Sequence, residues 1–226
     1  MARVNLARRA EIGSAKRART RAAILDAARG CYAAGPLTVD AVTQAAGLAK
    51  GTFYVHFTDL ASLEAELGAA LIAELDERLQ PARLAASDPL NRLATATTIL
   101  LRYLAATPAR ARLAARAATD IPGVGQAVLV RMGEDLAAAQ AAGRLALSSS
   151  DIAARIVSAM FLQAARDFGL GRMDARAVPD IVRAILRADG CAPDDAAGRA
   201  AEAARNADGF ARQLAATGEA DLLVGG

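Results

Sequence analysis

Four side chains that can hydrogen-bond to an external partner stand within one short stretch of the chain: Lys50, Thr52, Tyr54 and His56. The ammonium group of a lysine binds phosphate as a point charge, while hydroxyl, phenol and imidazole groups bond to phosphate oxygens or to the edges of bases. Gly51 lies among them and, lacking a Cβ, lets the backbone approach another surface closely. His56 is the chain's one histidine. A structural role, a pH-sensitive role and a phosphate contact are all open to it, and its position favours the phosphate contact.

The residues around this stretch predict two short helices joined by a tight turn. Thr38 is a natural N-cap for the first helix. Gly47 ends that helix, because a left-handed conformation costs little only without a Cβ. The second helix is expected from about Ala49 to Phe57. Two helices joined by such a glycine-containing turn form the helix-turn-helix pattern, whose second helix normally enters the major groove of DNA.

The same stretch resembles the TetR family of bacterial transcription regulators. The upstream segment Thr20–Gly35 looks like the first helix of that family. Leu60 departs from the pattern, because the family usually has a phosphate-binding lysine there; this departure concerns one phosphate contact and not the fold. The resemblance implies that Lys50 and Thr52 contact bases or phosphates, and that Thr38, Tyr54 and His56 reach phosphates. The residues that match the family pattern are Thr38, Val42, Ala45, Ala46, Gly47, Leu48, Lys50, Gly51, Thr52, Phe53, Tyr54, His56 and Phe57.

Positive charge is concentrated near these two helices. Residues 1–57 carry nine Lys or Arg and three Asp or Glu, a net charge of +6, whereas the remaining residues have a net charge of −3. Basic residues beside a helix-turn-helix are the electrostatic signature of phosphate contact. Arg17, Arg19 and Arg21 are therefore predicted to contact phosphates. Residues 1–18 are predicted to form a basic, mobile arm that can order on DNA through phosphates or the minor groove.

The whole chain is predicted to be all-α. Alanine, the best helix former, dominates a composition that is 54% hydrophobic. The expected architecture is an N-terminal three-helix helix-turn-helix domain over 19–62, a helical ligand-binding and dimerisation bundle over 63–192, and an extra C-terminal helix and tail over 193–226. Caps, prolines and glycines predict the later helices at about 59–81, 88–106, 107–119, 124–142, 148–168, 174–188 and 194–217.

The resemblance implies that the C-terminal bundle binds a small-molecule effector and that the last two helices of its core form a homodimer. The large or polar residues that could surround an effector are Tyr103, Arg116, Asp120, Met132, Phe161, Gln163, Arg166 and Phe168; core or surface positions are the alternative for each of them. The apolar residues expected at the dimer interface are Ile152, Ile156, Met160, Ile181 and Ile185. Completing the subunit's own core is their alternative role. The expected partners are thus a near-palindromic DNA operator, an effector and a second subunit.

Other functional classes fit the sequence less well. One histidine and two distant cysteines, Cys31 and Cys191, cannot build a usual zinc site. No motif for nucleophilic catalysis or phosphate binding is present, so we expect no metal, no cofactor and no catalytic residues, and an all-α enzyme is disfavoured. The absence of a signal peptide and of a long apolar segment predicts a cytoplasmic protein without a membrane partner. An activator, or a DNA-binding protein of this fold that needs no ligand, is the open alternative to a ligand-released repressor.

Overall fold

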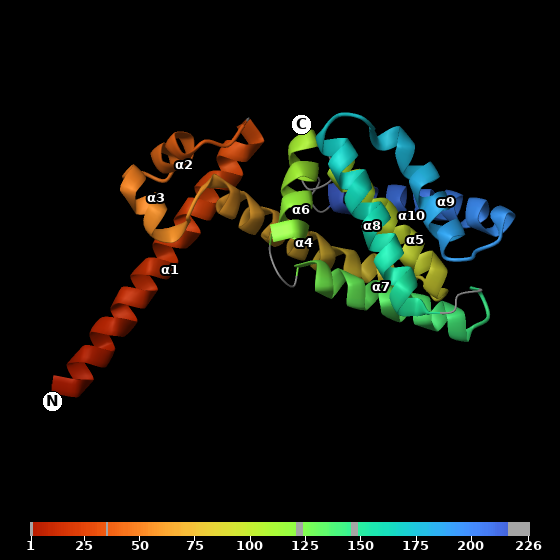
Figure 1. Ribbon diagram of the computed structural model, residues 1–226, viewed down its shortest axis with the longest axis horizontal. Coiled ribbons are helices and arrows are strands. Elements are labelled where there is room, and N and C mark those ends of the chain that lie inside the picture. Colours follow the sequence, from red (N-terminus) through yellow and green to blue (C-terminus); the bar gives the residue numbers. More distant parts are fainter. Residues whose placement is uncertain (1, 35, 121–123, 146–148, 217–226) are drawn as a thin grey trace. The chain divides into compact units, whose positions relative to one another are not determined.

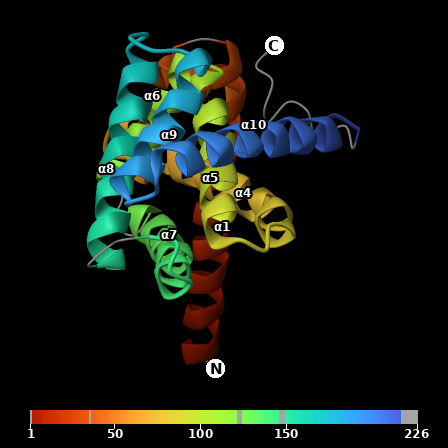
Figure 2. The same ribbon diagram turned by 90° about the vertical axis from the view of Figure 1, so that its right-hand side faces the viewer.

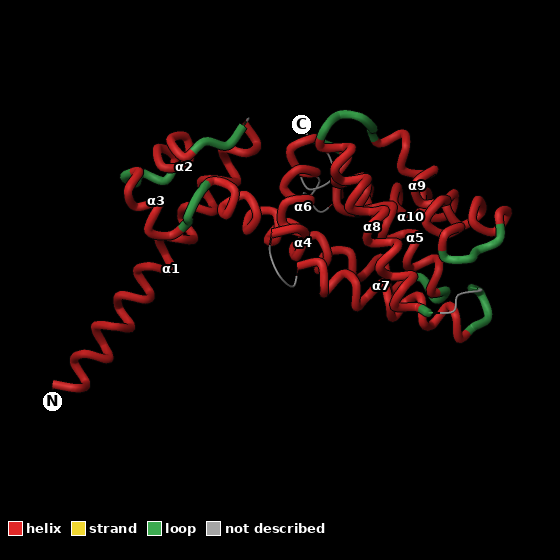
Figure 3. Tube along the Cα trace, viewed as in Figure 1, coloured by secondary structure: helices red, strands yellow, loops and turns green. Residues whose placement is uncertain are grey.

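The computed structural model describes residues 2–34, 36–120, 124–145 and 149–216, and every regular element among them is a helix (Figures 1 and 3). The predicted all-α fold is thus confirmed. The chain forms two compact units, Met1–Leu67 and Gly68–Gly226. The division falls within helix α4 (Leu60–Ala85), so one continuous helix contributes residues to both units.

The N-terminal unit contains α1 (Ala2–Ala34), α2 (Val39–Ala45), α3 (Lys50–His56) and the first turns of α4. Thr38 caps α2 as predicted, because its side chain accepts a hydrogen bond from the backbone N–H of Ala41 at 3.1 Å. Gly47 adopts a φ of 65° in the turn between α2 and α3, which is the conformation that the sequence required of it. The apolar side chains buried in this unit are Ile24, Ala28, Val42, Phe53, Phe57, Leu63, Ala65 and Leu67.

Helix α1 begins at Ala2, and the expected boundary near Thr20 between a mobile arm and a helix is absent. Alanine and arginine, two good helix formers, dominate the first 20 residues, and no proline interrupts them. Two side-chain hydrogen bonds run back along the helix, from Ser14 to the carbonyl of Glu11 at 2.8 Å and from Thr20 to that of Lys16 at 3.1 Å. Residues 11–19 are all exposed.

The C-terminal unit is a bundle around α5 (Pro89–Ala105), which packs against α6 (Pro108–Asp120), α7 (Val124–Ala141), α8 (Ser150–Gly169), α9 (Val178–Ala188) and α10 (Pro193–Ala216). The predicted cap of α5 is present, because the Asp88 carboxylate accepts backbone N–H bonds from Leu90 at 2.9 Å and Asn91 at 3.2 Å. Ser149 caps α8 in the same way. Local capping chemistry thus determines where several helices of the bundle begin.

Two helix boundaries near prolines differ from those expected from the sequence. Helix α4 does not end at Pro81 but continues to Ala85, and beyond this exposed proline Arg83 forms an ion pair with Asp135 on α7 at 2.9 Å. The segment after Asp174 starts with a short 3-10 helix (Ala175–Ala177), and α9 begins only at Val178. Proline has no N–H and is best accommodated in the first turn, so Pro179 sets the start of α9.

Helix α10 is an integral part of the C-terminal unit and not a separate appendage. It packs against α5 and α9, and Figure 2 shows it lying across α5. Arg199 links α10 to the start of α5, because its guanidinium donates hydrogen bonds to Asp88 at 2.8 Å and Asn91 at 2.7 Å. A third bond, to Asp195 at 3.0 Å, lies within α10. The predicted tail beyond residue 216 lies outside the described residues. The residues that α10 buries in the core are Ala196, Ala200, Ala203, Ala207, Phe210 and Leu214.

Candidate nucleic-acid interface and ligand cavity

The inner face of α3 is held firmly by aromatic packing. Phe53 is fully buried, and its ring stacks on that of Phe57 with centroids 5.6 Å apart. The Arg21 guanidinium lies 4.5 Å from the centroid of the Phe57 ring and also forms an ion pair with Glu66 on α4. Helix α3 has seven residues and could not persist alone. These contacts hold α3 in a fixed position within the N-terminal unit, as a recognition helix requires.

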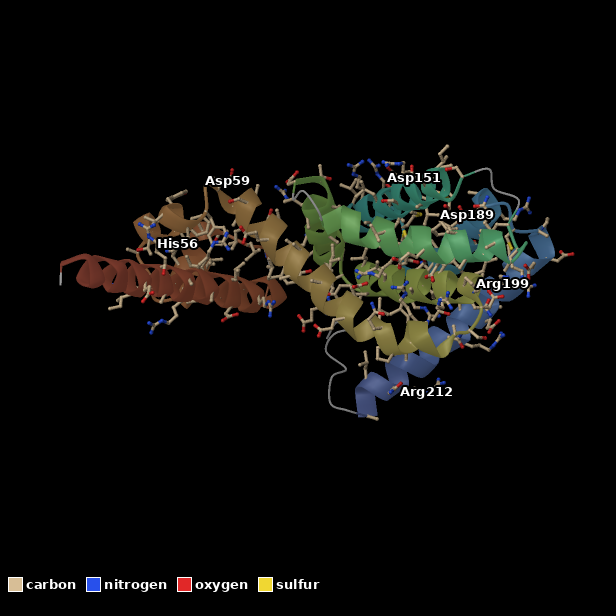
Figure 4. The ribbon with its side chains drawn as sticks, turned by 90° about the horizontal axis from the view of Figure 1, so that it is seen from below. His56, Asp59, Asp151, Asp189, Arg199 and Arg212 are labelled. Carbon is tan, nitrogen blue, oxygen red and sulfur yellow. The ribbon has the colours of Figure 1, made fainter. Side chains whose placement is uncertain are left out.

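The outer face of α3 presents most of the predicted contact residues to solvent. Lys50, Gly51 and Tyr54 are exposed, and Tyr54 has 54% of its surface accessible. Thr52 and His56 are half-buried at the edges of this face, with His56 at the helix end (Figure 4). The structure therefore brings these five residues together on a single short helix. Thr38, predicted with them, is exposed at the start of α2.

Lys50 has a partner that the sequence did not suggest. Its ammonium nitrogen lies 2.8 Å from a carboxylate oxygen of Asp40 on α2. The hydrogen bond that Lys50 donates to Asp40 raises the pKa of Lys50, so the ammonium stays charged. Because both side chains are well exposed, the pair adds little to the free energy of folding.

Packing among the described residues gives no reason for a glycine at position 51. A Cβ added there would meet no atom within 4 Å, and the residue is absent from the glycines with positive φ. Glycine within a helix costs about 0.5–1 kcal/mol relative to alanine. Since packing within the protein does not explain this glycine, its missing side chain fits close approach to an external surface.

The three predicted phosphate-binding arginines of α1 differ in their surroundings. Arg17 and Arg19 are exposed, whereas Arg21 is half-buried between Phe57 and Glu66. The hydrogen bond to Glu66 raises the pKa of Arg21. The first two remain available to an external anion, and Arg21 is engaged within the N-terminal unit.

The C-terminal unit contains a cavity of about 50 Å³ between α4, α5 and α7. Asp135 is almost fully buried and accepts bonds from Arg83 at 2.9 Å and from Arg92 at 3.0 Å. Arg131 forms an ion pair with Asp76 across the same space. The residues that line the cavity are Ile72, Asp76, Leu79, Arg83, Leu93, Ala96, Thr97, Leu100, Arg131, Met132 and Asp135.

Two polar groups at this cavity lack hydrogen-bond partners among the described residues. They are the hydroxyl of Thr97 and the Nε of Arg83, and both atoms are buried. Buried polar groups are usually satisfied, and an exception calls for an explanation. Apolar walls combined with a few convergent polar groups are typical of small-ligand sites.

The predicted ligand residues do not assemble around this cavity, with the exception of Met132. Tyr103 and Phe168 are buried in the core of the bundle, and Phe161 packs half-buried against it. The remaining four, Arg116, Asp120, Gln163 and Arg166, are exposed. The ion-paired lining was missed because Asp76, Arg83 and Asp135 look like solvated charges in the sequence, and nothing in their spacing shows that they converge.

The predicted dimer residues divide between surface and core. Ile152 and Ile156 on α8 are exposed, with 57% and 42% of their surfaces accessible, and Leu170 just after the helix is exposed as well. Met160 and Ile181 are half-buried against the core, and Ile185 is fully buried within it. Helix α8 therefore presents an apolar row, Ile152 and Ile156, that no other described part of the chain covers.

Two negative findings apply to the described residues. None of their helices combines the length and the apolar character that crossing a membrane requires. Nor do they bring together three or more His, Cys, Asp or Glu side chains in a way that could hold a metal ion.

No model of a known protein family matches the chain, and no curated protein does so either. Solved structures do match it. RolR in complex with resorcinol shares 20% sequence identity and a TM-score of 0.68, over 83% of this chain and 95% of RolR. SmeT, the repressor of the Stenotrophomonas maltophilia multidrug efflux pump SmeDEF, shares 22% identity and a TM-score of 0.55, over 74% of this chain and 89% of SmeT. TylP, a TetR regulator from Streptomyces fradiae, shares 21% identity and a TM-score of 0.57, over 88% of this chain and 99% of TylP. The chain thus has the fold of TetR regulators.

Proposed function

We propose that this protein is a TetR-like transcription regulator that acts as a dimeric repressor in the cytoplasm and releases its operator when a small molecule binds. One observation carries the proposal: α3 is clamped by Phe53 and Phe57 on one side and presents Lys50, Gly51 and Tyr54 on the other. A rigid short helix with an exposed polar face suits the major groove. Exposed Arg17 and Arg19 on α1 supply positive charge for the flanking phosphates.

The apolar row on α8, Ile152 and Ile156, supports the proposed dimer. Exposed large apolar residues that lie along one helix mark an interaction surface more often than isolated ones do. Ile152 and Ile156 are one turn apart, so they lie on the same face of α8. A twofold dimer would place two copies of α3 on successive major grooves, about 34–36 Å apart, and would therefore select a near-palindromic operator.

The cavity between α4, α5 and α7 is the proposed effector site. RolR, which has the same fold, binds resorcinol, a small aromatic diol. The Thr97 hydroxyl and the Arg83 Nε would offer hydrogen bonds to a small, largely apolar compound with hydroxyl groups, and the cavity of about 50 Å³ would have to widen to admit it. Helix α4 contributes Asp76 and Arg83 to the cavity and Glu66 to the N-terminal unit. A ligand that binds more tightly when α4 adopts one of two placements would shift the population of DNA-binding conformers.

Selection of bound sequences from random DNA, followed by fluorescence anisotropy with the selected operator, tests the proposal. Tyr54→Ala and Lys50→Ala should each weaken binding about tenfold or more without changing the unfolding transition, since neither side chain is buried. Arg212→Ala removes an exposed arginine from α10 and is the control for net charge. If the full chain selects no sequence at low salt, the proposed function is wrong.

The ligand part of the proposal has a separate test. Small phenols and alcohols are titrated into the operator complex, and release is followed by anisotropy. Met132→Trp, which fills the cavity, should abolish the response to any compound that releases the native protein while leaving operator affinity unchanged. If the same concentration of compound also releases the Met132→Trp variant from the operator, the effector site lies elsewhere.

A further inference from the structure

Val55 has the largest exposed fraction of any large apolar side chain in the described residues, at 70%. It lies on α3, and valine is not a favoured residue in a helix, because its branched side chain has restricted rotamers. Isolated exposed apolar residues are ordinary on most protein surfaces. This one belongs to the same short helix as Lys50 and Tyr54, where the side chains facing outward decide what the helix contacts.

The outward side of α3 consists of two different rows. Residues four positions apart lie on the same face of a helix, so Lys50 and Tyr54 form a polar row, and Gly51 and Val55 form an apolar row beside it. The surroundings of Gly51 are open, because an added Cβ would meet no described atom within 4 Å apart from its own chain neighbours and the backbone of α3. The isopropyl group of Val55 therefore stands next to bare backbone and is not shielded by a neighbouring side chain in its own row.

We propose that Val55 contacts the C5-methyl group of a thymine and so determines part of the operator sequence; this inference rests on the proposed function. In the major groove, the thymine methyl is the apolar group that base edges offer, and every other distinguishing group is a hydrogen-bond donor or acceptor. Valine cannot satisfy a donor or an acceptor, so an adenine, guanine or cytosine edge gains nothing from it. The flat Gly51 backbone lets the helix sit deep enough for the two apolar groups to touch.

Charge supports DNA as the occupant of this face in preference to another protein. Lys50 flanks the apolar row, and Arg17 and Arg19 are exposed on α1 in the same unit, while the first 57 residues carry a net charge of +6. The apolar row holds one large side chain, which is too small for a stable protein–protein contact. A second protein docked on Val55 is an alternative outcome that the experiment separates.

The experiment replaces thymine by deoxyuridine, which lacks the C5-methyl group alone, at each position of the operator selected with the full chain. The same replacement is made in both half-sites, and affinities are measured by anisotropy for the native protein and for Val55→Ala. The native protein should lose affinity at one symmetric position, by about fourfold per half-site, the value expected for one buried methyl group. Val55→Ala should bind the thymine operator with the same loss and should no longer distinguish thymine from deoxyuridine at that position.

Val130→Ala is the matched control, because Val130 is an exposed valine on α7 in the other unit; it should keep the native deoxyuridine profile. If no deoxyuridine substitution affects the native protein, or if Val55→Ala retains the same sensitive position, the assignment of Val55 is overturned while sequence-specific binding itself stands. A change in sedimentation of Val55→Ala with an unaltered deoxyuridine profile also overturns it, in favour of a protein contact. Failure of the native chain to bind any operator removes the proposed function as well.

Discussion

Asp189 is a buried carboxylate whose replacement should change how stability depends on pH. It occupies the C-cap of α9, is 0% exposed, and neither of its carboxylate oxygens has a hydrogen-bond partner among the described residues (Figure 4). Burial disfavours the charged form and raises the pKa of Asp189 from 3.8 to about 7. The carboxylate also lies at the negative end of the helix dipole, which acts in the same direction.

The size and sign of the effect follow from this shift. Between pH 4 and pH 7 the native state keeps a proton that the unfolded state has lost, so the free energy of unfolding falls as pH rises, by about 1.4 kcal/mol per pH unit. The stabilisation by the protonated Asp189 is fully present below pH 4 and fully lost above pH 7. For a shift of this size, the free energy of unfolding changes by up to about 4 kcal/mol in total. Asp88 and Asp195 have lowered pKa values and act oppositely, but only as the pH falls below about 4.

Urea unfolding at fixed protein concentration, repeated between pH 4.5 and pH 8.5, measures the effect for the native chain and for Asp189→Asn. The asparagine is uncharged, so its curve should lack the decline between pH 5 and pH 7, and the variant should be the more stable protein at pH 8. Asp180→Asn removes an exposed carboxylate from the same helix and controls for net charge. A native curve that is flat over this interval, or a variant that keeps the native slope, would refute the reasoning.

Three further substitutions test other contacts. Arg199→Met leaves carboxylates of α5 and α10 unpaired and should lower the free energy of unfolding by about 2–4 kcal/mol, whereas the exposed Arg205→Met should change it little in the same urea titration. Gly68→Ala places a Cβ of α4 against the backbone of α6 and should lower the free energy of unfolding by about 1–3 kcal/mol. An unchanged midpoint of urea unfolding would show that α4 and α6 can separate freely at this contact. Asp40→Asn frees Lys50 and removes a negative charge next to α3, the helix proposed to contact DNA. Affinity for duplex DNA at low salt, measured by anisotropy, should therefore rise by about 2- to 5-fold; a fall would mean that the carboxylate positions the ammonium.

The parts of the fold that depend on local chemistry could be predicted from the sequence. Thr38, Asp88 and Ser149 cap helices because a hydroxyl or carboxylate stands directly before a helical segment, and Gly47 turns the chain because its φ is positive. These interactions span three or four residues at most. Each of them can be recognised without knowing what packs against the helix.

The features that escaped prediction depend on partners far along the chain. Arg83 and Arg92 converge on Asp135, which is more than 40 residues away from either, and Arg83 and Asp135 both line the cavity. The position of α10 depends in the same way on Arg199 and Asp88, from opposite ends of the unit's sequence. Charged residues in a helical sequence are normally solvated, so nothing local distinguishes those that pair inside a bundle.

The arginines of α1 show how one sequence pattern can serve two physical tasks. A single basic cluster contains Arg17, Arg19 and Arg21, and its charge alone predicts a phosphate contact for each of them. Arg21 instead pairs with Glu66 and covers the ring of Phe57, the residue that closes the inner side of α3. A guanidinium held by a carboxylate and an aromatic face has little free energy to gain from a phosphate, since it would have to leave both contacts. Under the proposed function, Arg21 would therefore support α3 from within the unit, while Arg17 and Arg19, which are exposed, would supply the charge that phosphates require.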